Sequence, residues 1–211
     1  MTTPEIVNLA VGKPREFVWG KNIERSGIGK QTVFSAELKK DGFIGDGVEN
    51  VEFHGGVDRA VCFYPFEHYS FWNKQFGKLL TPPALGENIT ASGLMEKDVC
   101  IGDIFQIGTA VIQVTQGRIP CLTISKFNFE ENFLNRLVET GYTGYFLRVL
   151  EEGRINADSK IEWLEKEPNR VSVLFANHIL FHDQKNTAGV EKILSVEALA
   201  DVWRQKLLKL L

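Results

Sequence analysis

Short apolar segments alternate with glycine-rich turns along most of the chain, and they predict β-strands. The clearest read EIVNLAVG, KQTVFSAEL, DIFQIG, AVIQVTQ and GYFLRVL, and each is bounded by residues that favour turns. The stretch from 103 to 115 predicts a hairpin that turns at Ile107-Gly108-Thr109. The 19 glycines suit the turns and bulges of a closed or strongly bent sheet. We therefore expect a mostly β, barrel-like domain.

Two helices are expected among these strands. The first begins at Pro65, a residue well suited to the first helical position, and ends at Gly77. Its apolar face is formed by Phe66, Tyr69, Trp72 and Phe76. The second covers about 130–140 and ends at Gly141, since glycine commonly terminates helices.

The pattern changes after Glu167-Pro168-Asn169, where apolar residues recur at helical spacing. The spacing predicts three helices, over about 170–183, 188–194 and 196–210. Ser195 is the expected N-cap of the last helix. We therefore expect an α+β protein with a barrel-like domain over 1–165 and a three-helix domain over 166–211. The helical domain is expected to serve packing or interaction rather than catalysis.

Composition and charge narrow the class of protein. The chain has 211 residues, of which 44% are hydrophobic and 24% charged, which is typical of globular domains that bury a substantial core. The net charge of −3, without a long run of one sign, gives no indication of nucleic-acid binding. No apolar run reaches the roughly 18 residues of a membrane span, and the N-terminus lacks the pattern of a secretory signal. We expect a cytoplasmic location.

The three cysteines are an odd number at wide spacing, which fits neither a disulfide framework nor a paired-cysteine metal motif. Cys62 and Cys100 lie in apolar strand-like runs and are expected in the core. Cys121 follows the strongest predicted strand, and Pro120 cannot continue a strand ladder, so Cys121 is expected where the chain turns. A nearby Arg118 would favour its thiolate form and make it a candidate nucleophile or soft-metal ligand. The alternative is a buried apolar cysteine.

The run His54-Gly55-Gly56-Val57-Asp58-Arg59 gathers several polar groups just before a predicted buried strand. Its glycines would let backbone N–H groups approach an anion, and His54 exchanges protons near neutral pH. The alternative is a turn at Asp58–Arg59 that His54 caps.

Two further loops are candidates for an anion pocket: Gly86-Glu87-Asn88 and Ser26-Gly27-Ile28-Gly29-Lys30. The second differs from a phosphate-binding P-loop, because Glu24 stands where the first glycine is required and Gln31 where serine or threonine is required. We therefore exclude a nucleoside triphosphatase of that type.

His178 and His182 are four residues apart on a predicted helix, a spacing that suits metal binding from one face. Ile179 occupies the position of the glutamate in the zinc-peptidase motif. We therefore favour surface or packing roles for both histidines.

The order of the motifs is more specific than any one of them. In sequence order they read SGIGK, LKKDGFIGD, HGGVDRAV, YPFEHY, GENITASGL, IGDIFQIG and VTQGRIPC. This series resembles the MOSC-domain proteins, in the YiiM-like branch. The resemblance covers about residues 5–160, and the segment 168–211 is similar to the three-helix extension of that branch.

The resemblance implies a barrel-like MOSC fold and binding of a molybdenum cofactor, with Cys121 as the protein ligand to the metal. It also implies an oxidoreductase that reduces N-hydroxylated compounds, such as hydroxylaminopurines, to amines by oxygen-atom transfer, a detoxification reaction. The chain has no flavin, haem or iron–sulfur motif, so an external flavin or iron–sulfur partner would supply the electrons. No lysine motif suggests pyridoxal phosphate.

Further residues are assigned by their position in these motifs. The candidates for binding the pterin and its phosphate are Arg118, Lys30 and Ser26. Residues that either transfer protons or support the cofactor loops are His54, Asp58, Glu87 and Asn88. Two other functions fit the same residues: a non-catalytic sulfur or cofactor carrier that uses Cys121, and a binding module whose helical tail engages a partner.

Overall fold

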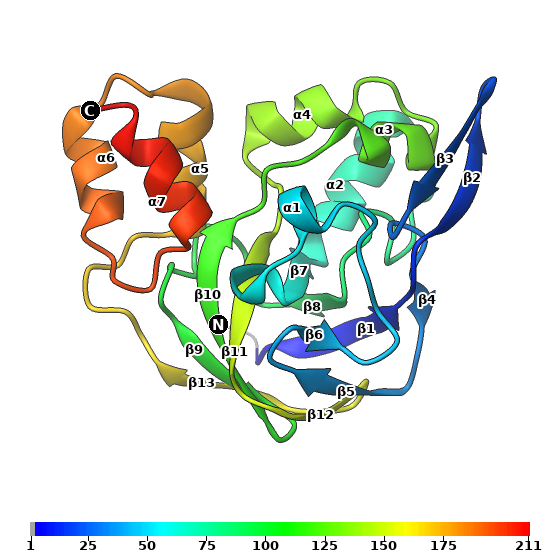
Figure 1. The fold of residues 1–211 in the computed structure, drawn as a ribbon, viewed down its shortest axis with the longest axis horizontal. Coiled ribbons are helices and arrows are strands. Elements are labelled where there is room, and N and C mark those ends of the chain that lie inside the picture. The colour runs from blue at the N-terminus through cyan, green and yellow to red at the C-terminus, as the bar shows by residue number, and fades with distance from the viewer. Residues whose placement is uncertain (1–2) are drawn as a thin grey trace.

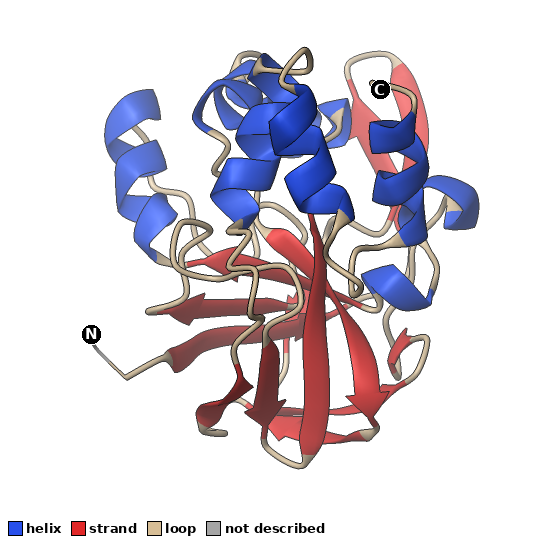
Figure 2. Cartoon of the chain, turned by 90° about the vertical axis from the view of Figure 1, so that its left-hand side faces the viewer, coloured by secondary structure: helices blue, strands red, loops and turns tan. Residues whose placement is uncertain are grey.

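The computed structural model describes residues 3–211, except the side chain of Phe53. A curled β-sheet forms the body of the molecule, and helices gather at one end of it (Figure 2). The three C-terminal helices lie together beside this body (Figure 1). The expected α+β class, with a barrel-like sheet and a helical extension, is confirmed.

The main sheet has eight strands in the order β13-β9-β10-β11-β7-β8-β1-β4. All described pairs are antiparallel except β7 and β8. Register shifts interrupt the pairing of β10 with β11 and of β1 with β8, and such bulges increase the local twist that curls a sheet. The strands are β1 (Glu5–Val11), β4 (Gln31–Thr32), β7 (Val61–Pro65), β8 (Ile89–Ser92), β9 (Ile104–Ile107), β10 (Ala110–Gly117), β11 (Tyr145–Glu151) and β13 (Ile161–Glu165).

Two small sheets complete the β structure. One has the order β12-β5-β6, formed by β12 (Gly153–Asn156), β5 (Ser35–Lys39) and β6 (Gly42–Phe43). The other is a projecting ribbon of β2 (Arg15–Trp19) and β3 (Asn22–Ser26) (Figure 1). Phe17 stacks on Trp19 within the ribbon and also contacts the edge of Phe127, with 5.8 Å between the ring centroids. This aromatic contact attaches the ribbon to the rest of the domain.

The helices of the first domain are α1 (Val51–His54), the 3₁₀ turn η1 (Val57–Arg59), α2 (Glu67–Phe76), α3 (Leu122–Asn128) and α4 (Phe133–Thr140). The expected start at Pro65 is wrong: Pro65 ends β7, and α2 begins at Glu67. The expected glycine stops are confirmed, since Gly77 and Gly141 adopt the left-handed conformation. Helix α3 was not expected from the sequence.

The C-terminal helices are α5 (Val173–His182), α6 (Thr187–Leu194) and α7 (Asp201–Leu208). The expected N-cap role of Ser195 is wrong, because Ser195 ends α6 and α7 begins six residues later, at Asp201. The apolar residues that suggested the helix are buried all the same: Val196, Leu199, Ala200, Trp203 and Leu207. One apolar core runs from the sheet into these three helices without interruption.

A second apolar cluster fills the space under α2, α3 and α4 and includes Trp72, Phe133 and Leu137. Within residues 3–211, no helix combines the length and apolar character needed to cross a lipid bilayer.

Candidate active site

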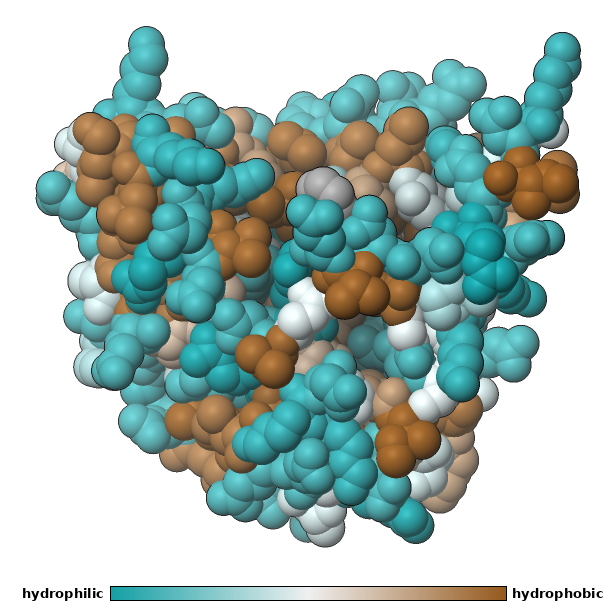
Figure 3. Space-filling view, viewed as in Figure 1, coloured by the Kyte–Doolittle hydropathy of each residue, from teal (hydrophilic) through white to brown (hydrophobic). Residues whose placement is uncertain are grey.

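A cavity of about 430 Å³ opens between the sheet, the β2–β3 ribbon and the loops around α1. This volume lies in the range of small-molecule sites. On the face drawn in Figure 3 the surface is hollowed near its centre, with apolar and polar residues mixed around the hollow. The expected site residues that line the cavity are Ser26, Lys30, His54, Asn88, Arg118 and Cys121. Two others, Asp58 and Glu87, are not among its lining residues.

Cys121 stands at the N-cap of α3 in an extended conformation. Strand β10 ends at Gly117 and the chain turns at Pro120, as the sequence predicts, although the helix that follows was not expected. The residue is partly exposed and contributes to the cavity wall. The alternative of a fully buried core cysteine is therefore wrong.

Arg118 enters the same cavity from the end of β10. Its Nη2 donates to the carbonyl oxygen of Leu85 at 2.8 Å, and its Nη1 lies 3.5 Å from the sulfur of Cys62. Both partners are uncharged as acceptors, and no carboxylate in the described part of the chain forms an ion pair with this guanidinium. The charge of the Glu87 carboxylate acts on Arg118 only from a distance, without an ion pair, so the cavity favours an anionic ligand beside this largely enclosed cation.

Cys62 provides a second thiol on the cavity wall. The sequence predicts only that this cysteine lies in the core. It is buried on β7, and burial raises the pKa of its thiol, so the sulfur remains protonated at neutral pH. All five residues of β7 are buried, so no alternation indicates which side chains face the cavity. Cys100, the third cysteine, is buried outside the cavity, as expected.

Lys30 is held in an ion pair with Asp46, a residue that the sequence analysis did not select. Asp46 also accepts hydrogen bonds from the backbone of Gly12 and from Nδ2 of Asn88, each at 2.8 Å. Asn88 in turn accepts from the backbone N–H of Cys62 at 3.0 Å. The carboxylate therefore neutralises Lys30, and this network joins three separate loops of the cavity wall.

The Ser26 loop is built from close backbone contacts. Ser26 Oγ accepts from the backbone N–H of Ile28 at 3.2 Å. A Cβ at position 27 would overlap the carbonyl oxygen of Gly47, so only glycine fits there. Residues of this loop line the cavity, and the N–H groups of Ile28 and Lys30 already donate within the loop.

His54 lies at the exposed mouth of the cavity, at the end of α1. Partial burial, followed by the charges of Arg118 and Arg59, lowers the pKa of its ring below the usual 6.5. The ring is therefore neutral at pH 7 and has both a donor and an acceptor nitrogen. The turn of the alternative interpretation is present as η1, but its N-cap position is Gly56, so the alternative role of His54 as the cap is wrong.

Asp58 and Glu87 support the loops around the cavity. Asp58 pairs with Arg148 at 2.8 Å and accepts from the backbone N–H of Asp201 at 3.3 Å. Glu87 is fully buried and accepts hydrogen bonds from three groups: Tyr69 Oη at 2.6 Å, Thr90 Oγ1 at 2.7 Å and Leu85 N at 3.1 Å. The structure therefore favours the supporting role that the sequence analysis left open for both carboxylates.

His178 and His182 lie on α5, outside the cavity. Nε2 of His182 is 2.9 Å from the carbonyl oxygen of Val138, and the rings of His178 and His182 are 5.7 Å apart. Among the residues that the structure describes, no group of three or more histidine, cysteine, aspartate and glutamate side chains is placed to hold a metal ion.

Comparisons with known proteins agree with the fold. The MOSC domain matches residues 50–162, and the YiiM-like, 3-alpha helix domain matches residues 171–211. The uncharacterized protein YflK of Bacillus subtilis is 44% identical over 207 residues, covering 97% of this chain and 93% of YflK. The crystal structure of YiiM from Geobacillus stearothermophilus superposes with a TM-score of 0.84 at 34% identity, covering 98% of each chain.

A fungal relative joins a similar region to a much longer chain. A protein of Gibberella moniliformis named Reductase is 35% identical over 132 residues, which are 60% of this chain and 23% of the fungal protein. The full-length matches and the two domain matches agree on one assignment. The chain belongs to the MOSC-domain family, in its YiiM-like branch with a C-terminal three-helix domain.

Proposed function

We propose that this protein is a molybdenum-cofactor-dependent oxidoreductase that reduces N-hydroxylated compounds, such as hydroxylaminopurines, to amines. Membership of the MOSC-domain family supports a role of this general kind. The main supporting observation is that one cavity is lined by both Cys121, which is partly exposed, and Arg118. Among the described residues, Arg118 has no carboxylate as an ion-pair partner. A soft sulfur ligand next to a fixed cation suits a metal cofactor with an anionic group.

The residues present fit such a cofactor. A bound molybdenum cofactor would supply dithiolene sulfurs and a metal centre capable of two-electron oxygen-atom transfer. Cys121 would hold the metal through Sγ, and Arg118 would hold the anionic part, with Ser26 on the wall of the same cavity. Lys30 would contribute less than a free lysine, since Asp46 neutralises it. The neutral ring of His54 at the mouth would hold or deliver a proton.

The electrons would come from an external flavin or iron–sulfur protein. The Gibberella relative supports this arrangement, because its MOSC-like region occupies less than a quarter of a chain named Reductase. We propose that a separate protein supplies the corresponding activity for this chain.

Turnover tests the proposal. Protein made in a host that synthesises the cofactor is incubated with a hydroxylaminopurine and a chemical reductant, and the amine product is measured by chromatography. The wild type and the control Cys100→Ala, which removes a thiol outside the cavity, should both form the amine, whereas Cys121→Ala should not. Cofactor-loaded wild type that forms no amine would overturn the reductase proposal in favour of the carrier function.

A further inference from the structure

The C-terminal helical domain contacts the cavity strand at the residue before Arg118. Asn177 on α5 is fully buried, and a Cβ at Gly117 would overlap its Oδ1. The same Cβ would lie 3.2 Å from the indole ring of Trp203 on α7. Two helices of this domain therefore pack directly on the backbone where β10 ends and the Arg118–Cys121 segment begins.

Asn177 also holds the loop between α4 and β11. Its Nδ2 donates to the carbonyl oxygen of Gly141 at 2.8 Å and to Thr143 Oγ1 at 3.0 Å. Thr143 is itself fully buried. One side chain therefore ties this loop to the helical domain through two hydrogen bonds shielded from water, where such bonds are strongest.

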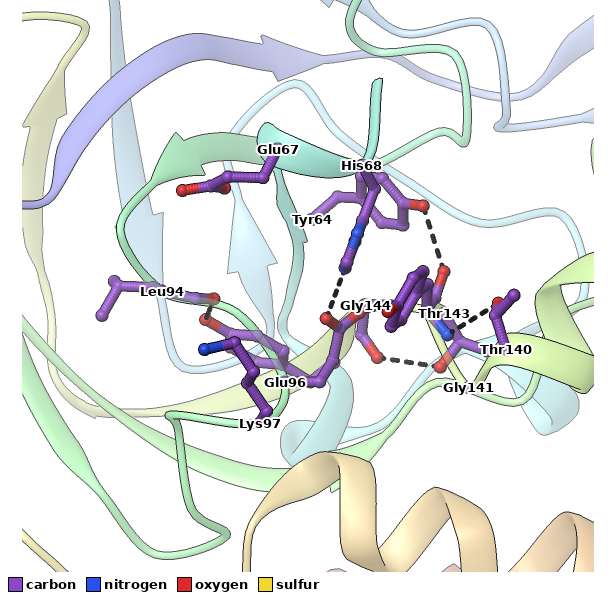
Figure 4. Close-up of polar contacts among 12 residues, drawn as sticks. Tyr64, Glu67, His68, Leu94, Glu96, Lys97, Thr140, Gly141, Thr143 and Gly144 are labelled. Carbon is purple, nitrogen blue, oxygen red and sulfur yellow. Dashed lines mark hydrogen bonds and ion pairs between the residues drawn. The ribbon is translucent and has the colours of Figure 1, made fainter. Parts of the chain in front are cut away.

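The same loop fixes the backbone of Arg118. The N–H of Arg118 donates to the carbonyl oxygen of Gly144 at 3.0 Å. The N–H of Gly144 donates to Glu96 Oε1 at 2.8 Å, and Glu96 Oε2 lies 2.6 Å from Nε2 of His68 (Figure 4). Glu96 and His68 are both almost wholly buried. The loop is thus held by Asn177 from one side and by this buried pair from the other.

A second set of contacts links the helical domain to the loop that carries His54. The carboxylate of Asp58 receives the backbone N–H of Asp201 at the start of α7, and it also pairs with Arg148. Arg148 donates to the carbonyl oxygen of Ala198 at 2.9 Å, and the N–H of Ala200 donates to Thr115 of β10 at 3.1 Å. The domain therefore touches both segments that bring candidate catalytic groups to the cavity.

We propose that the three-helix domain positions the cavity residues and that Asn177 is its central positioning residue, acting on Arg118 through Gly117 and the 141–144 loop. The assignment of these residues to an active site rests on the proposed function, whereas the positioning itself is a property of the protein without cofactor. Asn177 touches neither substrate nor cofactor in this proposal.

Hydrogen–deuterium exchange of the cofactor-free protein tests the positioning directly. Asn177→Leu keeps a similar volume but removes both donated hydrogen bonds. Thr143→Val removes one of the acceptors, together with the hydrogen bond that Thr143 Oγ1 donates to the carbonyl oxygen of Gly144 at 3.1 Å. Exchange of the Arg118 amide should accelerate about five- to thirtyfold in both variants. Thr143→Ser, which retains the hydroxyl, should restore protection. His182→Ala is the matched control, because it removes a contact of α5 with Val138 on α4 rather than with the 141–144 loop.

The outcome separates this proposal from the proposed function. An Arg118 amide that exchanges at the wild-type rate in Thr143→Val, or equally fast in His182→Ala, would overturn the positioning role even if the enzyme is active. Accelerated exchange in a protein that never reduces a hydroxylamine would uphold positioning and reject the function. If Asn177→Leu fails to fold, the Thr143 pair decides. In an active enzyme, Thr143→Val should lower kcat about 10–100-fold, as loss of supporting contacts commonly does, with a smaller change in KM.

Discussion

The ion pair between Lys30 and Asp46 gives a sharp test of how the cavity wall is held. The two side chains are 5% and 12% exposed, so the pair is buried by the surrounding loops. Asp46→Asn removes the negative charge but keeps a side chain of the same shape. Lys30 would then be a buried cation without its partner.

The expected loss of stability follows from this burial. Removing one partner of a buried ion pair costs about 3–5 kcal/mol, because the remaining charge stays desolvated. Gly12 N–H and Asn88 Nδ2 donate to different oxygens of Asp46, so asparagine leaves one of them without its acceptor, and we expect a cost of at least about 3 kcal/mol. For a chain of this size that corresponds to a fall in Tm of roughly 6–12 °C.

Urea unfolding of four proteins measures the effect: the wild type, Asp46→Asn, Lys30→Met and the double variant. The double variant should recover about 2 kcal/mol relative to Asp46→Asn, since the uncompensated charge is gone. Glu49→Gln is the control, because Glu49 pairs with Arg25 in a pair that is 43% and 53% exposed, and it should cost less than about 1 kcal/mol. An Asp46→Asn cost below that of the control, or no recovery in the double variant, would refute the reasoning.

Three other predictions concern single groups. The NMR titration of His54 should have a midpoint below 6.5, because burial and then nearby cations, Arg118 first, lower its pKa, and Arg118→Met should move the midpoint upward. As pH falls through 6.5, the unfolded chain protonates His54 before the folded protein does, so His54 lowers the free energy of unfolding in that range. His54→Gln should therefore weaken the loss of stability at acid pH, and an unchanged pH dependence of unfolding would contradict this prediction. Iodoacetamide at pH 8 should label Cys121 but not Cys100, as peptide mapping would show. Burial, and then the neighbouring carboxylate of Asp103, raise the pKa of Cys100 to about 11. Ser172→Ala should cost about 1 kcal/mol in thermal unfolding, because Ser172 caps α5, and an unchanged Tm would argue against that cap.

Features that depend on a few adjacent residues could be predicted from the sequence, both in the fold and in the site. The expected hairpin at Gly108 is present, because glycine there takes the left-handed backbone that the turn between β9 and β10 requires. The position of Cys121 follows from Pro120, which ends the ladder of β10 and directs the chain into a turn.

Long-range pairing accounts for what the sequence did not reveal. Asp46 meets Lys30 across 16 positions that include three short strands, and Asp58 meets Asp201 across 143 positions. Neither pair has a spacing that a helix or strand would impose. The orientation of Cys62 is hidden for another reason, since a strand buried on both faces has no alternation of apolar and polar residues.

The proposed role of Cys121 and Arg118 as the cofactor-holding residues is tested most directly by metal analysis of purified protein. The protein is produced in a host that makes the molybdenum cofactor, and molybdenum per chain is measured by mass spectrometry. We predict about one molybdenum per chain, the stoichiometry of a single metal ligand site, in the wild type and in Cys100→Ala. Cys121→Ala and Arg118→Met should lose most of it while remaining folded. Molybdenum retained at the wild-type level in Cys121→Ala would contradict the account.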